Sequence, residues 1–185
     1  MFLKDMQVEF EYGEANFPLV CRKEVFHVDK TSFIPQLEKA GRCLVFLRPR
    51  RFGKSLLVSM LEHYYDILYK NRFQELFGHL WIGKNETKER NSYMVMTLNF
   101  NSLIIDQGVK EFEMSLNFTI SNAIQKFQNK YESNLSTNIQ INERDAVNSF
   151  ERIVDNAQTS KNGLKVFSFA LMHRCISSLM NMILA

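Results

Sequence analysis

The sequence predicts an α/β fold with a partial, mostly parallel sheet flanked by helices, and three observations support this. The apolar run from Cys43 to Leu47 is bounded by charge and too short for a helix, which is typical of a buried strand. Two more apolar runs, 93–100 and 164–172, are further strand candidates. Segments with apolar residues every three or four positions separate them. The order strand, helix, strand, helix, strand is that of layered α/β proteins.

The first stretch of the chain, to about Phe26, mixes charged residues with single aromatic residues. This pattern predicts short strands and turns, centred on Tyr12-Gly13 and Phe17-Pro18.

The next element is a predicted helix over residues 33–40, where apolar residues recur at helical spacing. Thr31 or Ser32 is the expected N-cap, because a hydroxyl there accepts a hydrogen bond from the first turn. Pro35 is tolerated in the first turn, where peptide N–H groups have no intrahelical acceptor. Gly41 is the expected helix end.

Four further helical segments follow the first strand. They are a helix from Ser55 to about Leu68, a patch over 73–81 that ends near Gly83, a long helix over 109–131, and a helix over 144–157. The long helix has the clearest periodicity, and the polar stretch 134–142 that follows it predicts a loop.

Composition excludes several classes of protein. The chain has 185 residues, of which 45% are hydrophobic and 23% charged, as in one soluble domain. A net charge of +3 is too small to favour nucleic acid or an anionic membrane, and no apolar stretch approaches the roughly 20 residues that span a bilayer. Three unpaired cysteines and an acidic N-terminal stretch without an export signal favour a cytoplasmic location.

The turn between the first strand and the next helix reads RPRRFGKS and carries the chemistry. Its last three residues, Gly53-Lys54-Ser55, match the GK[ST] of a phosphate-binding loop in the strand-to-helix context that the motif requires. Gly53 allows peptide N–H groups to approach a phosphate, and Lys54 supplies a cation. The hydroxyl of Ser55 suits Mg²⁺, and the helix begins with its positive dipole end.

The full phosphate-loop pattern has glycine where this chain has Arg48, and a polar turn with an N-capping serine is the alternative explanation of the tripeptide. Arg48, Arg50 and Arg51 lie beside Lys54, and their mutual repulsion calls for a polyanion as counter-charge. A triphosphate fits that requirement.

The segment from Val28 to Asp66 resembles the N-terminal part of the bacterial AAA-ATPase-like proteins, in which VDKT, a short helix, an apolar strand and RPRRFGKS occur in this order. Arg48 matches that family's own loop. The similarity continues through 73–82 and 94–102. The resemblance implies a P-loop NTPase-like fold, a Walker A loop and ATP as ligand.

The resemblance implies ATP binding by Gly53, Lys54 and Ser55. The full set of candidate nucleotide-binding residues in the loop is Arg48, Arg50, Arg51, Phe52, Gly53, Lys54, Ser55 and Leu56, with Ser55 also as the ligand of Mg²⁺. The resemblance gives Asp29, Lys30 and Thr31 no defined role, and helix capping is the preferred explanation of these three.

The family then has an acidic strand end, LIDEYD, the Walker B motif, whose carboxylates order Mg²⁺ and the attacking water. The corresponding run here, 166–174, is followed by no carboxylate, and the last acidic residue is Asp155. We therefore expect nucleotide binding with little turnover, and no catalytic residue is assigned.

The residues after about 168 suggest a shifted reading frame. Read one frame over, the codons of residues 176–183 permit Phe-Phe-Ile-Asp-Glu-Tyr-Asp, in which Met180-Asn181 compels the Glu and Met182-Ile183 compels the second Asp. The hypothesis is a truncated protein, with residues 1–167 as the N-terminal part of an AAA-ATPase-like domain. Residues 168–185 would then be an aberrant segment that covers apolar surface only by accident.

Two other functions stay open at this point. In the first, the chain is an inert fragment or interaction module that binds no nucleotide. In the second, it binds nucleic acid through the arginines of the loop. One basic turn without interleaved aromatic residues disfavours nucleic acid. The sequence makes no prediction of oligomeric state, and the expected partner is a nucleotide.

Overall fold

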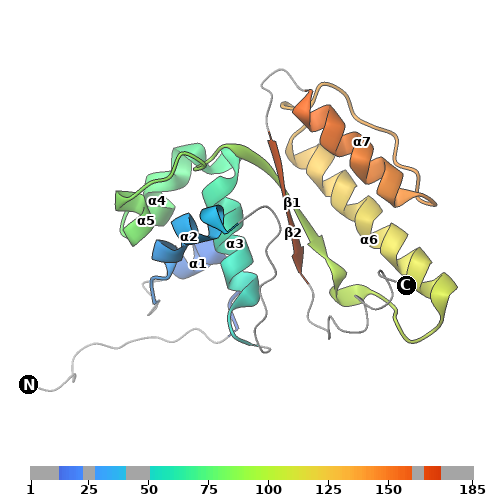
Figure 1. The fold of residues 1–185 in the computed structure, drawn as a ribbon, viewed down its shortest axis with the longest axis horizontal. Helices are drawn as coiled ribbons and strands as arrows, with labels where there is room; N and C mark the ends of the chain where they lie inside the picture. Colours follow the sequence, from blue (N-terminus) through green and yellow to red (C-terminus); the bar gives the residue numbers. More distant parts are fainter. Residues whose placement is uncertain (1–12, 23–27, 41–50, 160–164, 172–185) are drawn as a thin grey trace, which may run out of the picture. The chain divides into compact units, whose positions relative to one another are not determined.

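The computed structural model describes residues 13–22, 28–40, 51–159 and 165–171 (Figure 1). The chain divides into two compact units, Met1–Asn91 and Ser92–Ala185, each of which is described by itself. The predicted strand over 43–47 lies outside the described residues, so the wider P-loop-type sheet stays a prediction. The domain boundary after residue 167 also stays a prediction.

The described part of the first unit is helical. Its elements are α1 (Phe17–Arg22), η1 (Thr31–Phe33), α2 (Ile34–Lys39), α3 (Lys54–Tyr65), η2 (Ile67–Arg72), α4 (Phe73–Phe77) and α5 (Trp81–Lys84).

Helix α1 occupies a segment where the sequence predicted strands and turns, and that prediction was wrong. The helix forms because Phe17 is fully buried, with its ring against Phe77 at 5.0 Å between centroids. The carbonyl of Asn16 accepts the N–H groups of Leu19 and Val20, which closes the first turn. Pro18 in that first turn was the available signal, because proline is favoured there.

The predicted helix over 33–40 is present as η1 followed by α2, with Pro35 in the first turn of α2. The predicted N-cap was wrong. Lys30 occupies the N-cap of η1 and Phe33 that of α2, and neither helix has a capping side-chain hydrogen bond.

Helix α3 begins at Lys54 and ends at Tyr65, three residues before the predicted end at Leu68. The reason is Asp66, which is fully buried and extended, and whose Oδ1 accepts the N–H of Leu68 at 2.9 Å. An aspartate that caps a new turn competes with continuation of the helix. The chain continues as the 3₁₀-helix η2.

An aromatic cluster forms the core of the first unit. Tyr64 of α3 lies edge-on to Phe77 of α4 at 5.5 Å and contacts Phe73 at 6.1 Å, and all three rings are buried. Edge-to-face aromatic pairs stabilise a core beyond their buried area. The cluster therefore fixes the carboxyl half of α3 against α4.

The second unit contains the described sheet. Its elements are β1 (Tyr93–Asn99), η3 (Phe100–Ser102), α6 (Val109–Lys130), α7 (Ala146–Gln158) and β2 (Lys165–Leu171). Strands β1 and β2 are parallel, with Tyr93 opposite Lys165 and Asn99 opposite Leu171 (Figure 1). Helices α6 and α7 form the crossover between the two strands, as parallel pairing requires.

Both crossover helices lie where the periodicity predicted them. Helix α6 has 22 residues and buries Ile120, Ile124 and Phe127, whereas α7 buries Ala146, Ile153 and Ala157. Helix α7 begins at Ala146, two residues later than predicted, because Asp145 is its N-cap and accepts the N–H of Asn148. Within the described ranges, no helix has the length and apolar character needed to cross a bilayer.

The tyrosine that follows α6 as its C-cap forms hydrogen bonds with the backbone of β1. The hydroxyl of Tyr131 accepts the N–H of Val95 at 2.8 Å and donates to the carbonyl of Val95 at 3.4 Å. Tyr131 is fully buried and Val95 nearly so. Without this hydroxyl, two buried backbone groups would lose their partner.

We expect Tyr131→Phe to lower the free energy of unfolding by about 1–3 kcal/mol, the cost of leaving a buried polar group unsatisfied. Urea denaturation followed by circular dichroism measures this. Ser133→Ala is the control, since it removes a hydroxyl whose hydrogen bond to Asn134 is exposed. A loss for Tyr131→Phe no larger than for the control contradicts the role of the hydroxyl.

Candidate functional site

The second half of the predicted phosphate loop lies within the described residues, and its backbone is unusual. Arg51 has φ of 64° and Gly53 has φ of 72° with ψ of 18°, so two of three consecutive residues are left-handed. A residue that carries a side chain, as Arg51 does, rarely adopts this backbone conformation. Turns that include left-handed residues direct successive N–H groups into a concavity that suits anions.

The first turn of α3 follows directly. Gly53 is the N-cap, its carbonyl accepts the N–H of Leu57 at 2.9 Å, and no side chain caps the helix. The N–H groups of Lys54, Ser55 and Leu56 precede this first intrahelical bond and have no acceptor within the helix. The first turn contains no acidic side chain that would compete with an anion.

The loop is at the surface. Arg51, Phe52 and Gly53 are exposed, with the Phe52 side chain 64% exposed, and Lys54 and Ser55 are half-buried. A Cβ added to Gly53 would meet no atom within 4 Å among its described surroundings. The structure therefore brings Arg51, Phe52, Gly53, Lys54, Ser55 and Leu56 together at an accessible helix start. Arg48 and Arg50 lie outside the described residues.

Side chains that the sequence analysis missed hold α3 in position. The hydroxyl of Ser59 accepts the N–H of Phe17 at 3.1 Å, and the carbonyl of Ser59 lies 2.6 Å from Nδ1 of His63. The first of these contacts attaches α1 to the middle of α3, and the second lies within α3. Serine at this helical position gave no signal in the sequence, because its partner is 42 residues away.

A second set of hydrogen bonds holds the carboxyl end of α3. Oε1 of Glu38 accepts from the hydroxyls of Tyr65, at 3.2 Å, and Thr87, at 2.8 Å. Tyr64 contacts Thr87 through its hydroxyl, which accepts the N–H of Thr87 at 3.0 Å. The network joins α2, α3 and the segment after α5.

The segment Val28–Thr31 has a structural role in the described residues. Oδ1 of Asp29 accepts the N–H and hydroxyl of Thr31 at 2.8 and 2.6 Å, and Oδ2 accepts the N–H of Trp81 at 2.7 Å. The hydroxyl of Thr31 accepts the N–H of Ile82 at 3.1 Å. Capping was the predicted role of Asp29 and Thr31, and the helix that they cap is α5, about fifty residues further along the chain. Lys30 is exposed and takes no part in these bonds.

The shifted pKa values of Cys21 and Tyr64 argue against a role of either group as an activated nucleophile. Burial raises the pKa of the Cys21 thiol to about 11, and Glu75 adds to the shift. Burial also raises the pKa of the Tyr64 hydroxyl, against the lowering effect of Thr87. Both shifts favour the protonated form, whereas a catalytic thiolate or phenolate needs the opposite.

The ends of the two described strands of the second unit carry no carboxylate. None of the seven residues of β2 is acidic, and β1 ends in Asn99, whose Oδ1 accepts the N–H of Asn101. Among the described residues, no group of three or more His, Cys, Asp or Glu side chains is placed to hold a metal ion.

We expect Gly53→Ala to lower the free energy of unfolding by about 1–2 kcal/mol, because a Cβ strains the left-handed backbone even where space is open. Gly53→Asn is the matched variant and should lose less, because asparagine tolerates this conformation. Thermal and urea denaturation compare the three proteins. Equal stability of the alanine variant and the wild type contradicts the left-handed assignment.

We expect Asp29→Ala to lower stability by about 0.5–2 kcal/mol, the usual cost of losing a cap, and to shift the fluorescence of Trp81, the single tryptophan. Asp29→Asn retains one carbonyl oxygen and should fall between the alanine variant and the wild type. Lys30→Ala is the control and should change neither measurement. If the lysine variant has the larger effect, the capping role of Asp29 is wrong.

Comparison with known proteins was made for the whole chain. A family model described as predicted AAA-ATPase matches residues 11–167. No curated protein and no solved structure matches the chain. The matched range includes the loop, α3 and both crossover helices.

Proposed function

The chain belongs to the predicted AAA-ATPase family, and from this premise we propose that it binds ATP through the loop Arg48–Leu56. One observation carries the proposal. The left-handed residues Arg51 and Gly53 directly precede an accessible helix N-terminus that begins with Lys54. Backbone conformation, helix dipole and cation all favour the same ligand, a phosphate group.

Each residue of the loop has a proposed role. The peptide N–H groups around Gly53 and those of Ser55 and Leu56 bind phosphate oxygens, and the Lys54 ammonium neutralises the β and γ phosphates. Arg48, Arg50 and Arg51 add positive charge around the polyphosphate. Phe52 is exposed between the two left-handed residues and contributes its N–H.

Mg²⁺ fits this site only in part. Ser55 lies in the first turn of α3 and supplies a hydroxyl oxygen, which is a hard ligand that the ion accepts. When bound, Mg²⁺ would neutralise phosphate charge. The described strand ends provide no carboxylate as a second ligand, so the ion would be held through Ser55 and the phosphates themselves.

The proposed activity is therefore binding, with little hydrolysis. In P-loop ATPases, turnover depends on a carboxylate that orders Mg²⁺ and on a group that orients water. Strand β2 supplies neither, because its seven residues are Lys, Val, Phe, Ser, Phe, Ala and Leu. Peptide N–H groups and Lys54 do not depend on these carboxylates for attraction to phosphate.

We expect Mg-ATP at about 100 times its dissociation constant to add about 2.7 kcal/mol of stability, which raises the melting temperature by about 5–10 °C. Lys54→Ala should abolish this rise. Lys70→Ala is the matched control, an exposed lysine in η2, and should retain it. Melting without nucleotide shows whether each variant is folded.

Two results contradict the proposal. If millimolar Mg-ATP does not raise the melting temperature of the wild-type protein, the chain is the inert fragment or interaction module. If Lys54→Ala retains the full rise in melting temperature, the nucleotide binds at a site other than this loop.

A further inference from the structure

Two short elements of the first unit, η1 and α5, carry exposed aromatic side chains. Phe33 is the last residue of η1 and is 55% exposed, and Trp81 is the first residue of α5 and is 42% exposed. A single exposed apolar side chain is ordinary on a protein surface, whereas a group of them on neighbouring elements marks an interaction site.

Hydrogen bonds hold these two elements against each other. Oδ2 of Asp29 accepts the N–H of Trp81 at 2.7 Å. The hydroxyl of Thr31 accepts the N–H of Ile82 at 3.1 Å, and both of these residues are fully buried. The backbones of η1 and α5 lie side by side. Trp81 and Phe33 therefore flank the same buried contact.

An exposed lysine accompanies each aromatic residue. The N–H of Phe33 donates to the carbonyl of Lys30 at 3.2 Å, so the two residues are one 3₁₀ turn apart, where side chains lie one above the other. Lys84 follows Trp81 on α5 at the i, i+3 spacing of neighbours on one helix face. Both lysines are exposed. We call these four residues the aromatic–lysine surface.

The aromatic–lysine surface presents positive charge. In residues 28–33 and 81–85 the one acidic residue is Asp29. Its carboxylate already accepts three hydrogen bonds, two from Thr31 and one from Trp81. Glu86, which follows α5 closely, forms an ion pair with Arg90. An anionic partner therefore meets two lysines and a carboxylate that is engaged within the fold.

Aromatic rings next to lysines suit single-stranded nucleic acid. Its bases stack on aromatic rings whatever the sequence, and its phosphates attract cations placed beside those rings. Stacking supplies much of the affinity, so binding does not require a net charge above the +3 of this chain. An acidic peptide complements the lysines alone, because carboxylate side chains have no flat face to stack on an aromatic ring.

The aromatic–lysine surface is separate from the nucleotide loop. Glu38, which follows η1 in the chain, bonds to Tyr65 at the carboxyl end of α3. Thr87, which follows α5, bonds to Tyr64 of the same turn. The loop is at the amino end of α3, whose 12 residues span about 18 Å at 1.5 Å per residue. A strand bound at the surface therefore leaves the loop open to nucleotide.

We propose that the aromatic–lysine surface binds single-stranded nucleic acid. The two aromatic rings stack on bases, and the two lysines neutralise phosphates. The logarithm of the binding constant should fall with the logarithm of the salt concentration with a slope of about −1.4, from about −0.7 for each of two phosphate contacts on a single strand. The proposal does not depend on nucleotide binding by the loop.

The fluorescence of Trp81 measures this binding directly, because it is the single tryptophan of the chain. The full chain is titrated with an oligothymidylate of about twelve nucleotides, a length within the range of single-strand sites. We expect saturable quenching of the tryptophan emission, because a base stacks on the indole ring. Saturating Mg-ATP should leave the affinity for the oligonucleotide unchanged.

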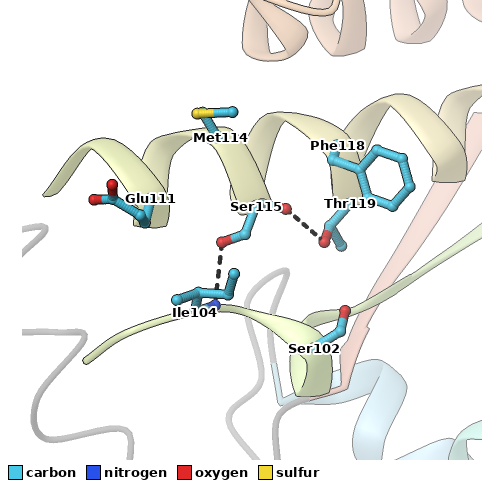
Figure 2. A pocket seen from close by; sticks show the side chains of 7 residues that line it. All are labelled: Ser102, Ile104, Glu111, Met114, Ser115, Phe118 and Thr119. Carbon is cyan, nitrogen blue, oxygen red and sulfur yellow. Dashed lines mark hydrogen bonds between the residues drawn. The ribbon is translucent and has the colours of Figure 1, made fainter. Parts of the chain in front are cut away.

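Matched variants assign the binding to this surface. Phe33→Ala should weaken it about tenfold, as expected for the loss of one stacked base. Phe118→Ala is the control and should leave the affinity unchanged, since Phe118 is a 69% exposed phenylalanine on α6 of the second unit (Figure 2). Lys84→Ala should make the salt slope shallower by about 0.7, whereas Lys70→Ala, at an exposed lysine of η2, should not change it. Melting curves show that each variant is folded.

Any of four results overturns the proposal. Titration without quenching shows that no base stacks on Trp81. An equal loss of affinity in Phe33→Ala and Phe118→Ala shows that the strand has no preference for this surface. Binding that saturating Mg-ATP or Lys54→Ala abolishes places the strand in the nucleotide loop. Quenching by poly-glutamate with the affinity of the oligonucleotide shows that the surface takes an acidic peptide instead.

Discussion

The described part of the first unit depends on how helix α3 is held. Buried contacts fix the last turns of this helix, whereas its first turn is accessible at the surface. Burial along the helix follows this division, from half-buried at Lys54 and Ser55 to fully buried at Tyr64. Asn91 completes the fixed end, since its N–H donates to the carbonyl of Tyr64 and its side-chain amide to that of Asp66 at 2.7 Å. A helix held in this way presents its N–H groups without needing to reorganise when an anion arrives, which favours binding.

The elements with local signals were predictable from the sequence. The spacing of apolar residues located α6 and α7, and the apolar runs located β1 and β2, because burial of one helical face or of a whole strand leaves a periodic pattern. Helix α1 and the break at Asp66 were not predicted. Helix α1 depends on the burial of Phe17, which the sequence does not record, and the break depends on the local bond between Asp66 and the N–H of Leu68.

The candidate site was predictable to a similar extent. The motif located Gly53, Lys54 and Ser55, but the left-handed conformation of Arg51 has no sequence signal, since arginine does not favour it. The link between Asp29 and Trp81 spans 52 residues, so only the folded chain shows which helix the aspartate caps. The residue types therefore predict the chemistry of the loop, which stays a prediction, whereas the contacts that support the loop were not predictable from the sequence.

The hydroxyl of Tyr131 has a consequence for how the sheet can grow. In a parallel ladder, alternate residues direct both backbone groups to one side, and at Val95 that side is already taken by a phenol. A new strand that approached β1 from there would have to displace the aromatic ring from its buried position. Pairing of a further strand with β1 at Val95 would therefore have to break both of these buried hydrogen bonds. One oxygen atom thus protects the backbone of β1 at Val95 from a new strand partner.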